Sequence, residues 1–83
     1  MTQAELLALF DQYHDLVYRL ALSYTKSVPD AEDVVQTVFL KALEGTRPPQ
    51  PGKERPWLCR VAVNCSRDLL RSRRFRQHEP LET

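Results

Sequence analysis

The sequence predicts an all-α fold, a small helical bundle of three main helices. In three segments apolar residues recur at steps of three and four, the periodicity of a helix with one side against a core. Prolines and glycines separate these segments, and no stretch shows the alternation of a half-buried strand. A chain of 83 residues makes one domain. We assign the helical domain to residues 1–76, with a loop at 46–55, and residues 77–83 to a tail or the start of a linker.

The first helix is predicted over about residues 2–26, and a break at 27–29 ends it. By periodicity, Tyr18 is the most exposed of its tyrosines. The residues expected to face the core are Leu6, Phe10, Tyr13, Val17, Leu20 and Tyr24.

The second helix is predicted to start with Asp30 as its N-cap and to end at Gly45 as its C-terminal cap. Acidic Glu32 and Asp33 occupy its first turn, where the helix dipole favours negative charge. Its inner residues are expected to be Ala31, Val34, Val35, Val38, Phe39 and Ala42.

The third helix is predicted from Pro56, which suits a first helical turn, to Arg76. The preceding residues 46–55 hold three prolines and a glycine, so we expect a non-helical loop there. The inner residues of the third helix are expected to be Leu58, Val61, Ala62, Cys65 and Leu69.

The opposite side of the third helix is rich in arginine, with short polar side chains between. The candidate DNA-binding residues there are Arg60, Asn64, Arg67, Asp68, Arg71, Arg73 and Arg74. Arginines clustered along one helix side indicate a phosphate-binding surface, and Asn64 and Asp68, one turn apart, are suited to base edges. Two alternatives remain open: Asp68 pairs locally with Arg67 or Arg71, or the arginines only solvate the domain.

Charge divides the chain into two halves of opposite sign. Residues 1–46 hold seven acidic and three basic side chains, a balance of −4, whereas residues 47–83 hold nine basic and four acidic, a balance of +5. This polarity indicates two different partners, although both ends also fit ordinary solvated surfaces.

A second ridge follows the outer side of the second helix, at helical spacing. Its residues are Asp33, Gln36, Thr37 and Leu40, and an acidic and an amide side chain beside a leucine resemble a docking surface for another helix. The alternative is that Leu40 folds under the first helix while Asp33 serves only the helix N-terminus.

Other features exclude several classes of protein. Cys59 and Cys65 lack the spacing of a disulfide, zinc or redox pair, and His14 and His78 have no partners at metal-ligand spacing. There is no signal peptide, membrane span, phosphate loop or nucleophile motif, so we expect a cytoplasmic, non-enzymatic protein without cofactor. Trp57 opens the third helix beside the proline loop, where it either joins the core or stacks on a base.

Two segments together resemble region 2 of the sigma-70 family of bacterial RNA polymerase sigma factors, most closely the extracytoplasmic-function (ECF) type. They are FDQYHDLVYRLALSYTKSVPDAEDVVQTVFLKAL at 10–43 and RPWLCRVAVNCSRDLLRSRR at 55–74. Their order and their spacing across the proline loop match the family over nearly the whole chain.

The resemblance implies a role for each surface. The ridge containing Asp33, Gln36 and Thr37 would dock on the coiled coil of the polymerase β′ clamp; the family usually has Glu at position 37, and Thr37 removes that charge. Asn64 and Asp68 would lie on the helix that reads the non-template strand of the minus-ten promoter element, while the arginines hold phosphates. Loop 46–55 corresponds to the segment that captures a flipped-out base, but its residues differ from those of the family.

The implied function is minus-ten recognition and promoter melting as part of RNA polymerase, with an anti-sigma factor as a further possible partner. The family's region 4, which reads the minus-thirty-five element, has no counterpart here, so we expect weak promoter binding by this part alone. The alternative is a helical protein-interaction module without direct DNA binding, for example one sequestered by an anti-sigma partner.

Overall fold

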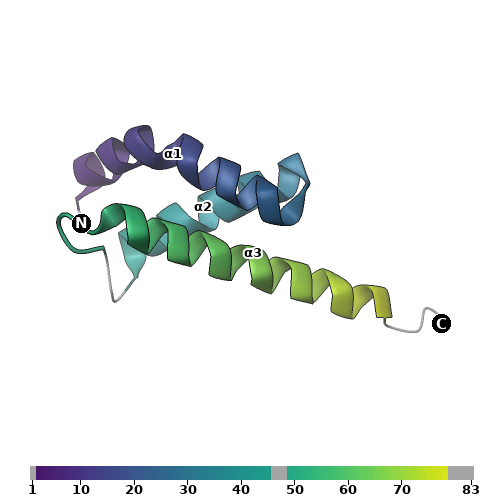
Figure 1. The fold of residues 1–83 in the computed structure, drawn as a ribbon. Coiled ribbons are helices and arrows are strands. Elements are labelled where there is room, and N and C mark those ends of the chain that lie inside the picture. Colours follow the sequence, from purple (N-terminus) through teal and green to yellow (C-terminus); the bar gives the residue numbers. More distant parts are fainter. Residues whose placement is uncertain (1, 46–48, 79–83) are drawn as a thin grey trace.

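The computed structural model describes residues 2–45 and 49–78, with side chains as far as residue 72. These residues form three helices, α1 (Gln3–Thr25), α2 (Val28–Glu44) and α3 (Glu54–His78), and contain no strand. Each helix contacts both of the others. Figure 1 shows α1 and α2 as an antiparallel hairpin, with α3 packed along it and continuing beyond the α1–α2 turn. The prediction of an all-α bundle is confirmed.

A tight turn joins α1 to α2. The backbone of Lys26 is left-handed, with φ of 56°, and its N–H donates to the carbonyl of Leu22 at 2.8 Å. The α2 helix then begins at Val28, so the predicted start at Asp30 is wrong. Pro29 does not delay the helix, because N–H groups of a first turn have no intrahelical acceptor to lose. Asp30 instead lies inside the first turn, where it is buried.

The start and end of α3 also differ from the prediction. The N–H of Lys53 donates to the carbonyl of Gln50 at 2.9 Å, closing a turn in which Gly52 has φ of 82°. The helix begins directly after this turn at Glu54, so residues 54–55 are helical and Pro56 lies in the first turn as expected. At the other end, residues 77–78 belong to α3 rather than to the predicted tail, while residues 46–48 and 79–83 lie outside the described part of the chain.

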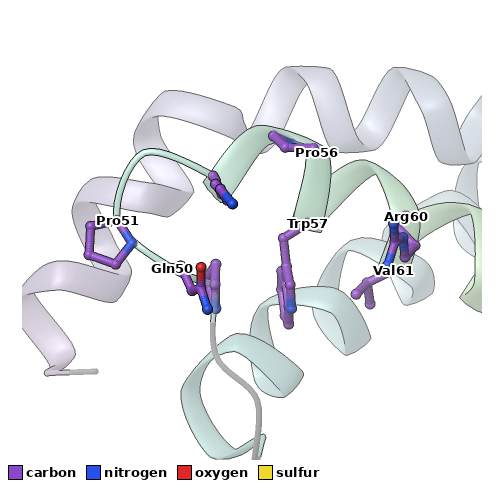
Figure 2. Close-up of a pocket in the computed structure, with 8 residues that line it drawn as sticks. Gln50, Pro51, Pro56, Trp57, Arg60 and Val61 are labelled. Atoms are coloured by element: carbon purple, nitrogen blue, oxygen red, sulfur yellow. The ribbon is translucent and has the colours of Figure 1, made fainter.

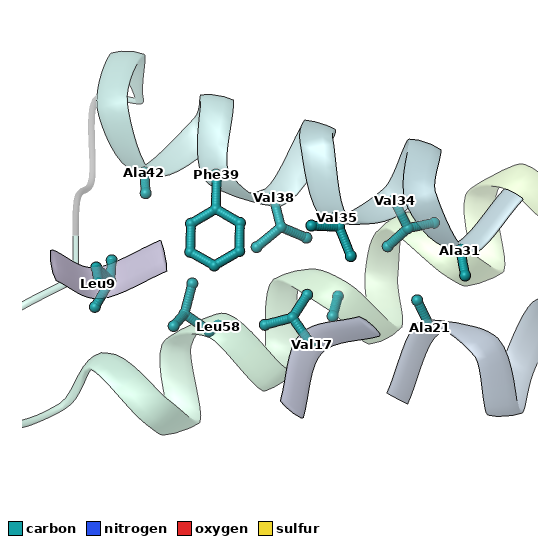
Figure 3. Close-up of a cluster of buried hydrophobic side chains, with 11 residues drawn as sticks. Leu9, Val17, Ala21, Ala31, Val34, Val35, Val38, Phe39, Ala42 and Leu58 are labelled. Carbon is teal, nitrogen blue, oxygen red and sulfur yellow. The ribbon is translucent and has the colours of Figure 1, made fainter. Parts of the chain in front are cut away.

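The core lies where the three helices meet (Figure 3). All six predicted inner residues of α2 are buried; they are Ala31, Val34, Val35, Val38, Phe39 and Ala42. On α3, Leu58 and Ala62 are buried, and Val61, Cys65 and Leu69 pack against the core from its edge, as predicted. Ser66, which the apolar pattern missed, is also fully buried.

The inner side of α1 was predicted only in part. Its buried residues are Leu9, Val17, Ala21 and Thr25, of which only Val17 was expected. The expected Leu6, Tyr13 and Leu20 flank the core half-buried; Tyr24 is likewise half-buried, whereas Phe10 is exposed. The buried residues include Ala21, whose small side chain lets a neighbouring helix approach closely. Tyr18, expected to be the most exposed tyrosine, is half-buried like the other two.

Candidate nucleic-acid interface

The outward side of α3 carries the polar residues predicted for it. The five with described side chains are all exposed: Arg60, Asn64, Arg67, Asp68 and Arg71, hereafter the α3 polar face. The opposite side of the helix holds the buried Leu58, Ala62 and Ser66. The side chains of Arg73 and Arg74 lie outside the described residues. The amphipathic division of α3 therefore presents this polar side to solvent while its other side closes the core.

The arginines of the α3 polar face are not neutralised internally. In the described part of the chain, the only contact at ion-pair distance between a basic and an acidic side chain joins His14 Nδ1 to Asp15 Oδ1 at 3.4 Å on α1. Asp68 therefore makes no ion pair with Arg67 or Arg71, and the first alternative interpretation is wrong. The face extends about 16 Å along the helix at 1.5 Å per residue. Unpaired guanidinium groups in such a row are suited to binding successive phosphates.

A pocket lies beside the N-terminal end of this face. It has a volume of about 870 Å³ and is lined by Pro49, Gln50, Pro51, Lys53, Pro56, Trp57, Arg60 and Val61. Figure 2 shows the side chains of Gln50 and Trp57 on opposite sides of the opening. Trp57 is half-buried, so it combines packing against the core with a surface accessible from the pocket. Arg60 lines the pocket and also belongs to the α3 polar face, so the pocket adjoins this face.

The predicted ridge on α2 is a real surface feature. Its members are all exposed: Asp33, Gln36, Thr37 and Leu40, hereafter the α2 ridge. Leu40 keeps 48% of its surface accessible, so the alternative in which it folds under the first helix is wrong. An exposed leucine beside an acidic and an amide side chain fits a protein-docking surface.

A groove of about 380 Å³ separates α2 from α3 and connects the two surfaces. It is lined by Asp33, Val34, Thr37 and Lys41 from α2 and by Cys65, Asp68 and Leu69 from α3. The groove therefore places two members of the α2 ridge opposite one member of the α3 polar face. Sequence reasoning did not single out Lys41, although its spacing of four from Thr37 puts it in the same row.

The pKa of the Cys65 thiol depends on its burial and on the charges around this groove. Burial raises the pKa of Cys65 above its ordinary value; the positive charge of Lys41 lowers it, and the negative charge of Asp68 raises it further. Lys41 and Asp68 thus both lie near this thiol, one on each helix. The thiol is free and half-buried.

The described residues place no three His, Cys, Asp or Glu side chains where they would hold a metal ion. Within the same residues, no helix combines the length and apolarity that a membrane crossing requires. The arrangement therefore offers two exposed binding surfaces, a pocket and the groove between α2 and α3.

Comparison with known proteins agrees with this arrangement. A family model described as Sigma-70 region 2 matches residues 9–76. The chain is 37% identical over 65 residues to "ECF RNA polymerase sigma factor SigE" of Mycolicibacterium smegmatis, covering 78% of this chain and 25% of that protein. It is 39% identical over 66 residues to "Probable RNA polymerase sigma factor RfaY" of Xanthomonas campestris pv. campestris, covering 78% of this chain and 16% of that protein.

A third relative is "ECF RNA polymerase sigma factor SigL" of Mycobacterium tuberculosis, 40% identical over 73 residues, with 83% of this chain and 40% of that protein covered. The matches thus span between 16% and 40% of the lengths of these three relatives. No solved structure matches the chain significantly.

Proposed function

Because this chain belongs to the sigma-70 region 2 family, we propose that it acts in transcription initiation as part of a sigma factor. In this role it docks on the β′ clamp of RNA polymerase and holds the opened non-template strand of the minus-ten promoter element. The role consists of binding alone and requires no bond chemistry. The observation that carries the proposal is the exposed α3 polar face, whose arginines have no carboxylate partner among the described residues.

On the α3 polar face, the side chains divide into two kinds of contact. Arg60, Arg67 and Arg71 suit phosphates, which position a strand without reading its sequence. Asn64 and Asp68 are shorter and lie among them, so they address bases: an amide pairs with adenine, and a carboxylate accepts from the amino group of cytosine. This division supports both affinity and sequence preference.

The pocket at Trp57 supports capture of an unstacked base. Its prolines and its indole offer apolar surface to a planar ring, and stacking of a base on an aromatic side chain contributes about 1–3 kcal/mol. Lys53 and Arg60 add positive charge to the lining, which suits the phosphate attached to such a base. A base that leaves the stack beside α3 would therefore have a site within the same surface.

The α2 ridge supports the proposed contact with the clamp. Asp33, Gln36 and Leu40 are exposed together, and they supply a charge, a hydrogen-bonding amide and an apolar anchor. Thr37, where the family usually has Glu, contributes a hydroxyl in place of a charge. The acidic half of the chain would thus meet the polymerase, while the basic half meets DNA.

The DNA-binding part is tested with single-stranded oligonucleotides that carry or lack a candidate minus-ten sequence, in the presence of the β′ clamp helices. Asn64→Ala should reduce discrimination between sequences, by about 1–3 kcal/mol for a lost base contact. Arg71→Ala should weaken binding to all sequences alike and make the salt dependence shallower. If both variants only unfold the domain, as seen by circular dichroism, α3 is a core helix and does not read DNA.

The clamp-binding part is tested by pull-down with the isolated β′ clamp helices. Asp33→Ala and Gln36→Ala should each weaken capture while the helical circular dichroism signal is retained, because both residues are exposed. Unchanged capture would count against the clamp contact. Clamp binding without any salt-dependent binding of single-stranded DNA would instead favour a protein-interaction module.

A further inference from the structure

Lys41 is a cation on the α2 wall of the groove, opposite Asp68 of the α3 polar face. Asp33, Thr37 and Lys41 follow one another at steps of four and all line the groove. Gln36 and Leu40, the other two members of the α2 ridge, do not line it. The outer surface of α2 therefore has two rows, and Lys41 belongs to the row nearer α3.

The ammonium of Lys41 is not held by a neighbouring carboxylate. Lys41 is exposed, and no ion pair within the described residues joins it to Asp33 or Asp68. On the helix itself, the residue one turn before it is the neutral Thr37, so the favourable pairing of an acid with a lysine four residues later is missing. The charge is nevertheless close to α3, because Lys41 lines the same groove as Cys65, Asp68 and Leu69 of that helix.

A single strand on the α3 polar face would meet this groove at Asp68. The carboxylate of Asp68 lines the groove, and it repels a phosphate backbone that passes over it. A lysine between α2 and α3 offsets this repulsion, since its compact charge on a flexible stem adapts to a phosphate without fixed geometry. The positive charge needed where the strand crosses the groove is thus supplied by Lys41 of α2.

We propose that Lys41 binds a phosphate of the same single strand that lies along α3, so that α2 as well as α3 contacts DNA. The inference rests on the proposed function and extends it to a residue outside the basic half of the chain. Lys41 is then a phosphate contact: it adds affinity for every sequence and discriminates between none.

The test measures the binding of a fluorescein-labelled single-stranded oligodeoxynucleotide of mixed sequence, together with the clamp helices, as a function of salt. Lys41→Gln should make the slope of log affinity against log salt shallower by about 0.7, the value for one lost phosphate contact on a single strand. Arg19→Gln is the matched control: it removes one positive charge from an exposed position on α1, which does not line the groove. Arg71→Gln is measured alongside as the α3 reference.

The three variants separate the possible failures. If Arg71→Gln flattens the slope while Lys41→Gln behaves like Arg19→Gln, Lys41 does not contact DNA, although the proposed function stands. If neither Arg71→Gln nor Lys41→Gln changes the slope, the proposed function fails together with this inference. Weaker pull-down of the clamp helices by Lys41→Gln, with an unchanged slope, would assign Lys41 to the protein interface and overturn the proposal.

Thr37→Glu provides a second measurement, made with saturating clamp helices because Thr37 also belongs to the α2 ridge. A glutamate four residues before Lys41 should pair with its ammonium and withdraw it from the strand. Lys41→Gln should then flatten the slope much less in the Thr37→Glu background than in the natural sequence, with Thr37→Gln as the uncharged control. An effect of Lys41→Gln that is equally large in all three backgrounds would show that Lys41 does not act through a free ammonium in this groove.

Discussion

The ring of Phe10 on α1 stands edge-on against the ring of Phe39 on α2, with centroids 4.9 Å apart and an interplanar angle of 63°. Phe39 is 5% exposed, whereas Phe10 is 38% exposed. The pair therefore joins the two helices of the hairpin at the margin of the core, with one ring inside and the other covering it. Edge-to-face geometry of this kind is favourable beyond the area that it buries.

Truncating the two rings should have unequal effects. Phe39→Ala leaves a cavity in the core and should lower the free energy of unfolding by about 3–5 kcal/mol, a large part of the stability of a small domain. Phe10→Ala should cost clearly less, because much of its ring is already in water. Urea denaturation followed by circular dichroism measures both, and the double variant should reveal a coupling of about 0.5–1.5 kcal/mol. An equal decrease in the free energy of unfolding for the two single variants would contradict the deeper burial of Phe39.

The hydroxyl of Ser66 lies fully buried on α3, and its Oγ has no hydrogen-bond partner within the described part of the chain. Ser66→Ala removes this unsatisfied group and should raise the free energy of unfolding by about 1 kcal/mol. Ser72→Ala on the same helix is the control: Ser72 is exposed, so its replacement should change stability by less than about 0.5 kcal/mol. A loss of stability in Ser66→Ala alone would show that the hydroxyl has a partner in solution.

The reactivity of Cys65 should follow the charges of the groove. Because burial raises the pKa of this thiol, and the thiolate is the nucleophile, iodoacetamide should alkylate Cys65 more slowly than a small free thiol at neutral pH. In a Cys59→Ser background, Asp68→Asn should speed the reaction and Lys41→Gln should slow it, since their charges shift the pKa in opposite directions. The alkylation rate in denaturant, where Cys65 is fully exposed, is the control for burial of the thiol. Faster alkylation in Lys41→Gln than in Asp68→Asn would contradict the positions of these two charges.

The N-terminus of α1 should add a pH dependence to stability. The carboxylate of Glu5 accepts from the N–H of Thr2 at 2.8 Å, while the N–H of Glu5 donates to Thr2 Oγ1 at 3.1 Å, forming a capping box. The hydrogen bonds from the backbone and the side chain of Thr2 lower the pKa of Glu5 below its ordinary value. A lowered folded pKa gives stability above the unfolded pKa of about 4.3, which is lost as the pH falls through the folded value.

Glu5→Gln should therefore lower the Tm at neutral pH, and its difference from the natural protein should narrow as the pH falls below about 4. Thermal unfolding monitored by circular dichroism across this range measures the difference, with Gln12→Glu on the exposed side of α1 as a control for an added carboxylate. A difference that stays constant through the acidic range would mean that the capping box does not form in solution.

The buried and exposed sides of α2 and α3 can be derived from the sequence alone. The six inner residues of α2 were predicted correctly, and the polar side of α3 is exposed as expected, because the inner side of each helix is marked by apolar residues at helical spacing. The errors at the helix starts have a local cause. Pro29 and Pro56 are compatible with a first helical turn, so a proline marks the neighbourhood of a start without fixing the residue.

The tertiary structure decided what periodicity does not encode. On α1, large apolar residues occur on several sides, and packing of the three helices buried Leu9, Ala21 and Thr25, whereas Leu20 lies at the edge of the core and Phe10 is exposed. Likewise, Asp33 and Lys41 come to line one groove with Asp68 only because α2 and α3 pack in a particular register. Helical spacing determines which residues share a side of one helix. The rotation and offset between helices depend on how the side chains of all three helices interlock in the common core, and that is a property of the assembled fold.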